Sequence, residues 1–300
     1  MPLVEVDGRE LSVSNLDKVL YPEAGFTKGQ VIDYYARIAP VMLTHVADRG
    51  VTLRRWPNGV DEGSFFEKRC PSHRPGWVQV APGPGDSGGN IDYCRLADTA
   101  SLVWAANLAA LEIHGPMARG DDIESPTMVV FDLDPGAPAA MTECGQVGLL
   151  VRDVLEGIGL ACFPKTSGSK GLQLYVPLNT ACTHEQASHF AHSVAKAIEA
   201  GHPKEVVSNM KKDLRKGKVL IDWSQNSRHK TTIAAYSLRG RPRPTVSTPV
   251  TWDEVFDAAD GSVLSFEAAD VLERIAEVGD LFEPVATLEQ ELPGLRRFRV

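Results

Sequence analysis

The sequence contains no apolar run long enough to cross a membrane. A bilayer-spanning helix needs about 20 consecutive, mostly apolar residues, and runs such as residues 128–131 are far shorter. Residues 1–7 also lack the basic start and apolar stretch of a secretory signal peptide. We therefore expect a cytoplasmic protein without a membrane partner.

Cysteines are few and show no paired spacing. The five are Cys70, Cys94, Cys144, Cys162 and Cys182. An odd, scattered set excludes a disulfide-rich secreted scaffold and predicts a reduced protein whose thiols are mostly small core residues. Cys70, His73 and Cys94 offer an incomplete zinc set with irregular spacing, so we favour the structural interpretation.

An excess of basic residues is also missing. The net charge is −8 at pH 7, which argues against a protein that coats nucleic acid by charge alone. Basic residues are nevertheless concentrated in residues 204–218 and 228–243, on either side of Asp222. Such runs are usually only a solvated face, but their position beside a candidate metal ligand favours a channel for a polyanion.

Helical and strand patterns alternate along the chain. Apolar spacing predicts helices over 28–46 and 184–199, strands over 128–132, 159–164 and 172–177, and a mainly helical segment from about Trp252. A chain of 300 residues with 43% apolar residues can bury a sizeable core. We predict an α+β fold, a two-layer α/β arrangement, with residues 1–300 forming one catalytic domain.

Two aspartates one residue apart, Asp132 and Asp134, end the strand predicted from residue 128. Alternate strand residues point to the same face, so both carboxylates project together just before Pro135. They repel each other unless a cation lies between them, and Mg²⁺ and Mn²⁺ prefer carboxylate oxygens. Asp222 ends another short apolar strand. Three strand-borne aspartates suit two-metal phosphoryl or nucleotidyl transfer, although Asp-Pro-Gly alone is equally typical of a surface turn.

The segment 166–171, Thr-Ser-Gly-Ser-Lys-Gly, separates two apolar segments. Small residues let a backbone approach a phosphate, and Lys170 adds positive charge. The segment is not a Walker A sequence, and Ser-Gly turns are common. Beside a metal centre, however, it predicts a cradle for a triphosphate.

Two further features are ambiguous from the residues alone. His114 follows an apolar run, where a lone histidine is usually structural. Phe65 and Phe66 are adjacent aromatics that can stack on bases but more often belong to a local core.

Five segments closely resemble, in order, the polymerase domain of bacterial ligase D, a primase-type polymerase of the archaeo-eukaryotic primase superfamily. They are Phe131-Asp-Leu-Asp-Pro-Gly136, Thr166-Ser-Gly-Ser-Lys-Gly-Leu172, Val219-Leu-Ile-Asp-Trp-Ser-Gln-Asn226, Lys230-Thr-Thr-Ile-Ala234 and Tyr236-Ser-Leu-Arg-Gly240. The resemblance covers nearly the whole chain from Asn15. It implies a primase-polymerase fold, with an RNA-recognition-like catalytic sheet packed against a second α/β module.

The resemblance also implies residue roles. Two Mn²⁺ or Mg²⁺ ions are expected at the catalytic Asp132, Asp134 and Asp222. The nucleotide-binding residues are expected to be Arg54, Ser167, Ser169, Lys170, Gln225, Lys230 and Arg239, with His114 beside the ribose. The DNA-binding residues are expected to be Phe65 and Phe66 near the templating base, and Asn15, Lys18 and Lys28 around a downstream 5′-phosphate.

One residue departs from the pattern of the family. Gln173 stands where many members carry histidine, and glutamine can donate a hydrogen bond but cannot carry a positive charge. This departure concerns nucleotide affinity and leaves the reaction class unchanged.

The expected function is template-directed nucleotidyl transfer that fills short gaps and extends ends in DNA repair, with ribonucleotides preferred. The implied partners are gapped or broken DNA with a 5′-phosphate, NTP or dNTP, Ku and a DNA ligase, at the nucleoid. Two alternatives stay open: a primase that needs no primer, and a catalytically weak end-binding module that recruits a ligase. No ligase or nuclease sequence is present, so we expect a stand-alone protein or an excised domain.

Overall fold

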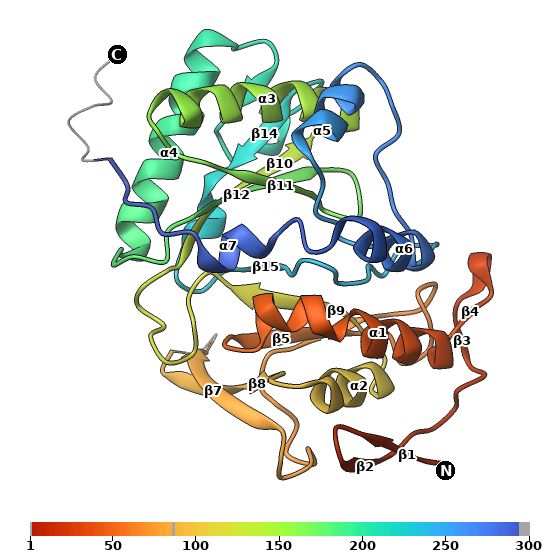
Figure 1. Ribbon diagram of the computed structural model, residues 1–300. Coiled ribbons are helices and arrows are strands. Elements are labelled where there is room, and N and C mark those ends of the chain that lie inside the picture. Colours follow the sequence, from red (N-terminus) through yellow and green to blue (C-terminus); the bar gives the residue numbers. More distant parts are fainter. Residues whose placement is uncertain (1, 86–87, 294–300) are drawn as a thin grey trace. The chain divides into compact units, whose positions relative to one another are not determined.

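The computed structural model describes residues 2–85 and 88–293, which form two compact units (Figure 1). Unit 1 comprises Met1–Ile123, Thr231–Ser247 and Phe266–Asp280, and unit 2 comprises Glu124–Lys230, Thr248–Ser265 and Leu281–Val300. Each unit is built from segments that lie far apart in the sequence, and each has its own sheet. The expectation of one catalytic domain over residues 1–300 stays a prediction.

The main sheet of unit 2 has the strand order β11-β12-β10-β14-β13. The strands are β10 (Met128–Pro135), β11 (Phe163–Thr166), β12 (Leu172–Pro177), β13 (Val206–Val207) and β14 (Val219–Asp222). Strand β10 is antiparallel to both of its neighbours, β12 and β14. Helices α3 (Met141–Gly157) and α4 (His184–Gly201) contact its strands (Figure 1). Apart from the two-residue strand β13, the chain order β10-α3-β11-β12-α4-β14 is a split βαβ arrangement, as expected for an RNA-recognition-like sheet.

The core of unit 2 explains why β10 holds its position. Val129, Val130 and Phe131 are fully buried, and Phe131 meets Phe190 of α4 edge to face. The side chain of Asn226 exchanges two hydrogen bonds of 2.8 Å with the backbone N–H and C=O of Val130. Further helices are α5 (Trp252–Ala259), which packs on α3, and α7 (Glu283–Thr287), which contacts β12. The apolar part of β10 is therefore fixed on both sides before the aspartates begin.

Unit 1 contains a six-stranded sheet with the order β15-β9-β5-β8-β7, and β6 pairs with β5. The strands are β5 (Gly50–Arg55), β6 (Phe65–Glu67), β7 (Gln79–Pro84), β8 (Asn90–Arg95), β9 (Ala110–Pro116) and β15 (Thr231–Ile233). Its helices are α1 (Lys28–Val46), α2 (Thr99–Asn107) and α6 (Ala268–Val278). Unit 1 also contains two small antiparallel strand pairs: β1 (Leu3–Val6) with β2 (Arg9–Ser12), and β3 (Val19–Tyr21) with β4 (Phe26–Thr27). Helix α1 packs against α2.

The helix predicted over 28–46 is confirmed. Thr27 caps it, since its side chain accepts a hydrogen bond from the Gln30 N–H while the Gln30 side chain accepts from the Thr27 N–H. The helix predicted over 184–199 is α4, two residues longer. The strand predicted over 159–164 is wrong in its bounds: Gly159 has a φ of +82° in the turn that ends α3, and β11 begins only at Phe163.

The cysteines require a correction. Cys70 and Cys94 form a disulfide, so the expectation of reduced thiols is wrong for this pair, and neither sulfur is a zinc ligand. The fold brings their Cα atoms to 4.7 Å, inside the range that a disulfide needs, and the spacing in the sequence could not show this. Cys144 and Cys162 are buried free thiols, and burial raises the pKa of each to about 12.

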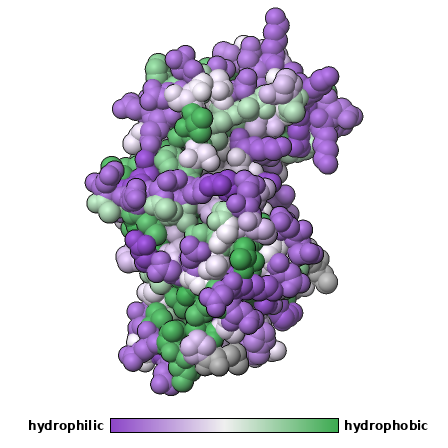
Figure 2. All heavy atoms as spheres, turned by 90° about the vertical axis from the view of Figure 1, so that its right-hand side faces the viewer, coloured by the Kyte–Doolittle hydropathy of each residue, from purple (hydrophilic) through white to green (hydrophobic). Residues whose placement is uncertain are grey.

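The surface is mainly polar on the face that Figure 2 shows, where apolar residues form several separate groups. Within residues 2–85 and 88–293, none of the helices combines the length and the apolar character that a bilayer span requires.

Candidate active site

The three predicted metal ligands lie on neighbouring strands of unit 2. Asp132 and Asp134 are two residues apart on β10, and Asp222 is the last residue of β14. The antiparallel register places Asp132 directly opposite Asp222, and Cβ atoms of such pairs lie about 4.5–5.5 Å apart. The doublet is therefore part of the sheet and not an isolated turn, and the structure brings all three aspartates to one region.

Two of the three aspartate side chains, Asp132 and Asp222, accept hydrogen bonds from neutral donors. Asp132 accepts from Gln173 Nε2 at 3.1 Å and from Gln225 Nε2 at 3.4 Å. Asp222 accepts from the backbone N–H and the hydroxyl of Ser224, at 2.9 and 2.6 Å. Among the described residues, no three His, Cys, Asp or Glu side chains form a ready-made metal cage. The three aspartates therefore lie in one region, but their carboxylates do not surround one common metal position.

The raised pKa values of Asp132 and Asp134 reflect burial and the repulsion between the carboxylates of this cluster. Burial, the charge of Asp134 and that of Asp222 raise the pKa of Asp132 to about 7, against the opposing effects of Gln173 and Lys165. Partial loss of hydration and the charge of Asp222 also raise the pKa of Asp134, although this residue lies at the exposed end of the strand. Arg215, from the first basic segment, lowers it. The cluster has more negative charge than its surroundings compensate.

This donor set fits a hard divalent cation. Carboxylates are the oxygen ligands that Mg²⁺ and Mn²⁺ prefer, and a positive ion would relieve the repulsion that raises the pKa of Asp132. Beside Asp132, the amide oxygen of Gln225 is buried and has no hydrogen-bond partner among the described residues.

A buried polar chain lies behind Asp132. The fully buried Lys165 donates from Nζ to Gln173 Oε1 at 2.6 Å, and Tyr175 donates to the same oxygen at 3.4 Å. Because a lysine ammonium can only donate, it fixes the amide of Gln173 with its oxygen toward Lys165 and its NH₂ toward Asp132. The glutamine that departs from the family pattern is therefore a neutral link between a buried cation and a candidate ligand.

The predicted phosphate loop joins β11 to β12. The Ser167 hydroxyl accepts hydrogen bonds from the N–H groups of Ser169 and Gly171, at 3.3 and 3.1 Å, while Lys170 is exposed. A Cβ on Gly171 would lie 2.2 Å from the Leu133 carbonyl oxygen. Only glycine allows this approach, which seats the loop against β10 between the two aspartates. Lys230, also in unit 2, is half-buried.

In unit 1, three of the predicted nucleotide residues surround one buried carboxylate. Glu112 on β9 lies 2.9 Å from His114 Nε2, 3.5 Å from Arg54 Nη1 and 3.4 Å from Arg239 Nε, and it accepts a hydrogen bond from the Gly240 N–H at 3.1 Å. Burial acts to raise its pKa, but the hydrogen bond of His114 and the charge of Arg239 prevail and lower it to about 2. Burial also lowers the pKa of His114.

The two predicted stacking aromatics are exposed on β6. Phe65 is 46% and Phe66 55% exposed. The guanidinium of Arg54 lies 4.9 Å from the centre of the Phe66 ring and 4.6 Å from that of Trp56. Phe66 also meets His114 edge to face at 5.6 Å. Exposed rings on a cationic support can stack on bases, so the local-core interpretation is wrong for this pair.

The predicted 5′-phosphate residues gather at the start of α1. The Lys18 N–H donates to the Asn15 carbonyl, and the Lys28 N–H donates to the Lys18 carbonyl. Lys28 is buried, and its Nζ donates to the Ser14 carbonyl at 2.7 Å. Burial and the charges of Lys18 and Arg55 lower its pKa. Two lysines at a helix N-terminus form an environment suited to an anion.

Two polar residues at these sites were not predicted from the sequence. Glu112 stands in the apolar strand Leu111-Glu-Ile-His, and Lys165 precedes the phosphate loop. The sequence feature that could have identified them is a charged residue inside an otherwise apolar strand, because a charged side chain is rarely buried without partners.

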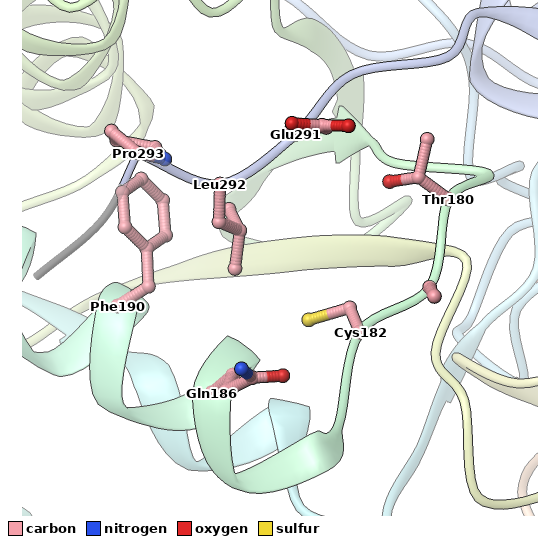
Figure 3. A pocket seen from close by; sticks show the side chains of 8 residues that line it. Thr180, Cys182, Gln186, Phe190, Glu291, Leu292 and Pro293 are labelled. Atoms are coloured by element: carbon pink, nitrogen blue, oxygen red, sulfur yellow. The ribbon is translucent and has the colours of Figure 1, made fainter.

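A separate cavity of about 410 Å³ lies in unit 2. Phe190 of α4 and Leu292 of the C-terminal segment point into it, and Cys182 and Gln186 line it (Figure 3). It lies beyond Pro177, which pairs with the first residue of β10, so it is at the opposite end of this strand from Asp134.

The family model described as "LigD, primase-polymerase domain" matches residues 27–282. The chain is 46% identical to the multifunctional non-homologous end joining DNA repair protein LigD of Mycobacterium tuberculosis, covering 97% of this chain and 39% of that protein. It is also 46% identical to LigD of Mycolicibacterium smegmatis, covering 96% and 38%. The chain therefore spans about two fifths of the length of these relatives.

A solved structure is similar over almost the same range. The polymerase domain from Mycobacterium tuberculosis ligase D in complex with DNA matches with a TM-score of 0.88 and 45% identity. The match covers 93% of this chain and 99% of that one. The mixed α/β fold predicted from the sequence is thereby confirmed.

Proposed function

The chain belongs to the LigD primase-polymerase domain family, and from this premise we propose that it is a template-directed polymerase that fills short gaps and extends broken ends in DNA repair. One observation carries the proposal. Asp132 and Asp222 face each other across β10 and β14, with Asp134 on the same strand and the loop 167–171 seated beside them. This arrangement of carboxylates and a phosphate loop fits nucleotidyl transfer.

Asp132, Asp134 and Asp222 would hold two divalent ions, Mn²⁺ or Mg²⁺, and these would supply positive charge to activate the primer 3′-hydroxyl and to stabilise the departing pyrophosphate. Gln173 and Ser224 orient the carboxylates through the hydrogen bonds described above. The serine hydroxyls and N–H groups of the loop bind phosphate oxygens. The loop residues Ser167, Ser169 and Lys170, together with Gln225 and Lys230, bind the triphosphate, and the lysines neutralise charge that develops during transfer.

Unit 1 supplies the sugar, base and DNA contacts in this proposal. His114 reads the ribose 2′-hydroxyl, which favours ribonucleotides, and Arg54 and Arg239 add positive charge for the triphosphate. Phe65 and Phe66 stack near the templating base.

The 5′-phosphate of the downstream strand binds at the start of α1. Asn15, Lys18 and Lys28 hold it, supported by the clustering of two lysines at a helix N-terminus. The substrate is therefore gapped or broken DNA at the nucleoid. The names of the relatives refer to non-homologous end joining, and we propose Ku and a DNA ligase as partners.

Nucleotide insertion on a gapped duplex tests this function. The duplex carries a 5′-phosphate at the gap, and insertion of ribo- and deoxynucleotides is compared in Mn²⁺. The proposal predicts template-dependent insertion with ribonucleotides preferred. Tight gap binding without insertion by the wild-type protein would favour an end-binding module, and dinucleotide synthesis on a template without primer would favour a primase.

A further inference from the structure

Glu112 contacts three side chains assigned to the nucleotide in unit 1, those of Arg54, His114 and Arg239. We propose that Glu112 is a positioning residue: it holds His114 in the tautomer protonated at Nε2, which leaves Nδ1 as the hydrogen-bond acceptor for the ribose 2′-hydroxyl. This inference rests on the proposed polymerase function and adds the residue that sets how the sugar is read.

The contacts of Glu112 define the state of the His114 ring. Glu112 and His114 are two residues apart on β9, so both point to the same face of the strand. The carboxylate of Glu112, 1% exposed, meets His114 Nε2 at 2.9 Å. An ionised carboxylate only accepts hydrogen bonds, so the proton of a neutral ring must be on Nε2. Among the described residues, His114 Nδ1 takes part in no hydrogen bond.

The pKa values of Glu112 and His114 are shifted in the directions that this geometry requires. The pKa of Glu112 is lowered to about 2, so the residue is ionised at neutral pH. Burial lowers the pKa of His114, with Arg239 and Arg54 acting in the same direction against Glu112. The ring is therefore neutral, and its second nitrogen carries a lone pair.

Neighbouring residues fix the positions of Glu112 and His114. The Gly240 N–H reaches the other oxygen of Glu112 at 3.1 Å, and this approach requires glycine, because a Cβ at position 240 would lie 2.1 Å from the Trp56 ring. Arg54 lies near the rings of both Trp56 and Phe66, and Phe66 packs edge to face on His114. The His114 side chain is 13% exposed, so part of it is open to a ligand.

The substitution Glu112→Gln gives a defined expectation because glutamine has nearly the same shape. The Gly240 N–H donates to Glu112 Oε1, and the Arg239 Nε atom lies 3.4 Å from the same oxygen, so the amide oxygen of Gln takes that position. Its NH₂ group then faces His114 and donates to Nε2, which moves the ring proton to Nδ1. A 2′-hydroxyl can still accept from this N–H, but its own proton loses the acceptor, so sugar selectivity falls without disappearing.

The first readout is the tautomer of His114. ¹⁵N NMR of the imidazoles is recorded for the wild-type protein, and the His114 signal is assigned as the one missing from His114→Gln. The proposal predicts a neutral ring protonated at Nε2 in the wild type and at Nδ1 in Glu112→Gln. A wild-type ring that is charged, or protonated at Nδ1, overturns the proposal even if the variant fails to fold.

The second readout is single-nucleotide insertion. We expect the ribo-to-deoxy ratio of kcat/KM to fall about tenfold in Glu112→Gln, the effect of about one hydrogen bond, while deoxynucleotide insertion continues. Asp48→Asn is the matched control, since it removes an exposed carboxylate that pairs with Arg95 in the same unit, and it should keep the wild-type ratio. An unchanged ratio in Glu112→Gln overturns the positioning role. Failure of the wild-type protein to insert any nucleotide would instead contradict the proposed function.

Discussion

Asp132 of unit 2 and Glu112 of unit 1 carry the same functional group and experience opposite environments. The pKa of Asp132 is raised to about 7 by burial and two neighbouring aspartates, whereas that of Glu112 is lowered to about 2 by a histidine, an arginine and a backbone N–H despite its burial. The first cluster carries more negative charge than Lys165 and Arg215 compensate, so it can accept a cation. The second is already neutralised and can only orient its partners.

The two carboxylates also affect stability with opposite signs. The folded protein binds a proton at Asp132 more tightly than the unfolded chain does, so the stability contributed there is full below the ordinary pKa of 3.8 and is lost as pH rises to about 7. Glu112 binds a proton less tightly when folded, so its contribution is present above 4.5 and is lost as pH falls to about 2.

The largest expected effect is catalytic and confined to the unit 2 cluster. Asp132→Asn and Asp134→Asn should each reduce primer extension by about a thousandfold or more, because metal-assisted transfer contributes several kcal/mol that one missing ligand forfeits. Primer extension measures the loss, and a gel shift with the same gapped duplex should show nearly unchanged DNA binding. Extension at even a tenth of the wild-type rate would refute the ligand assignment.

Removal of the charge of Glu112 should destabilise the protein. Glu112→Gln takes a buried anion from Arg239 and His114 and should lower the free energy of unfolding by about 2 kcal/mol. Urea denaturation at pH 8 measures this change, with Asp48→Asn as the exposed control, for which less than about 0.5 kcal/mol is expected. Equal changes for the two variants would remove the contrast between them.

Removal of the charge of Asp132 should act in the opposite direction. Without divalent ions, Asp132→Asn relieves repulsion from Asp134 and Asp222 and should raise the free energy of unfolding by about 1 kcal/mol at pH 8. The gain should shrink as pH falls through 7, where the wild-type residue becomes protonated. Urea denaturation in EDTA at pH 8 and pH 5 tests this, and a loss of stability at pH 8 would contradict it.

The start of α1 carries lysines where the unit 2 cluster carries aspartates. We expect the smallest effect from a substitution there. Lys18→Ala should reduce the preference for gaps with a 5′-phosphate over gaps without one by about tenfold, since one charged hydrogen bond is lost. Fluorescence anisotropy with both duplexes measures the preference. Lys196→Ala, on α4 of unit 2, is the control. If Lys18→Ala weakens binding to both duplexes equally, the pocket is misassigned.

Much of the unit 2 site was predictable from the sequence because its signals are local. The Asp132-Leu-Asp134 pattern at the end of an apolar run identified both the strand and the shared face of the carboxylates. Thr27 and Gln30 likewise marked the start of α1. These features depend on residues within one or two turns of chain, where spacing and side-chain chemistry are sufficient.

The features that could not be predicted from the sequence depend on contacts between different segments of the chain. Glu112 meets Arg239 and Gly240 only because the chain returns to unit 1 after leaving it. Cys70 meets Cys94 only because its loop lies beside β8, where the Cys70 N–H donates to the Asp92 carbonyl. Lys165 could not be assigned before Gln173 was known to lie opposite it. No periodicity encodes such pairings.

The most direct test of this account is a calorimetric titration of Mn²⁺ at pH 6 and pH 8. With a pKa of about 7 for Asp132, the account predicts binding about tenfold tighter at pH 8, with proton release at pH 6, and weak binding without this pH dependence in Asp132→Asn. Equal affinity of wild type and Asp132→Asn would contradict the claim that the aspartate cluster is built to receive a divalent cation.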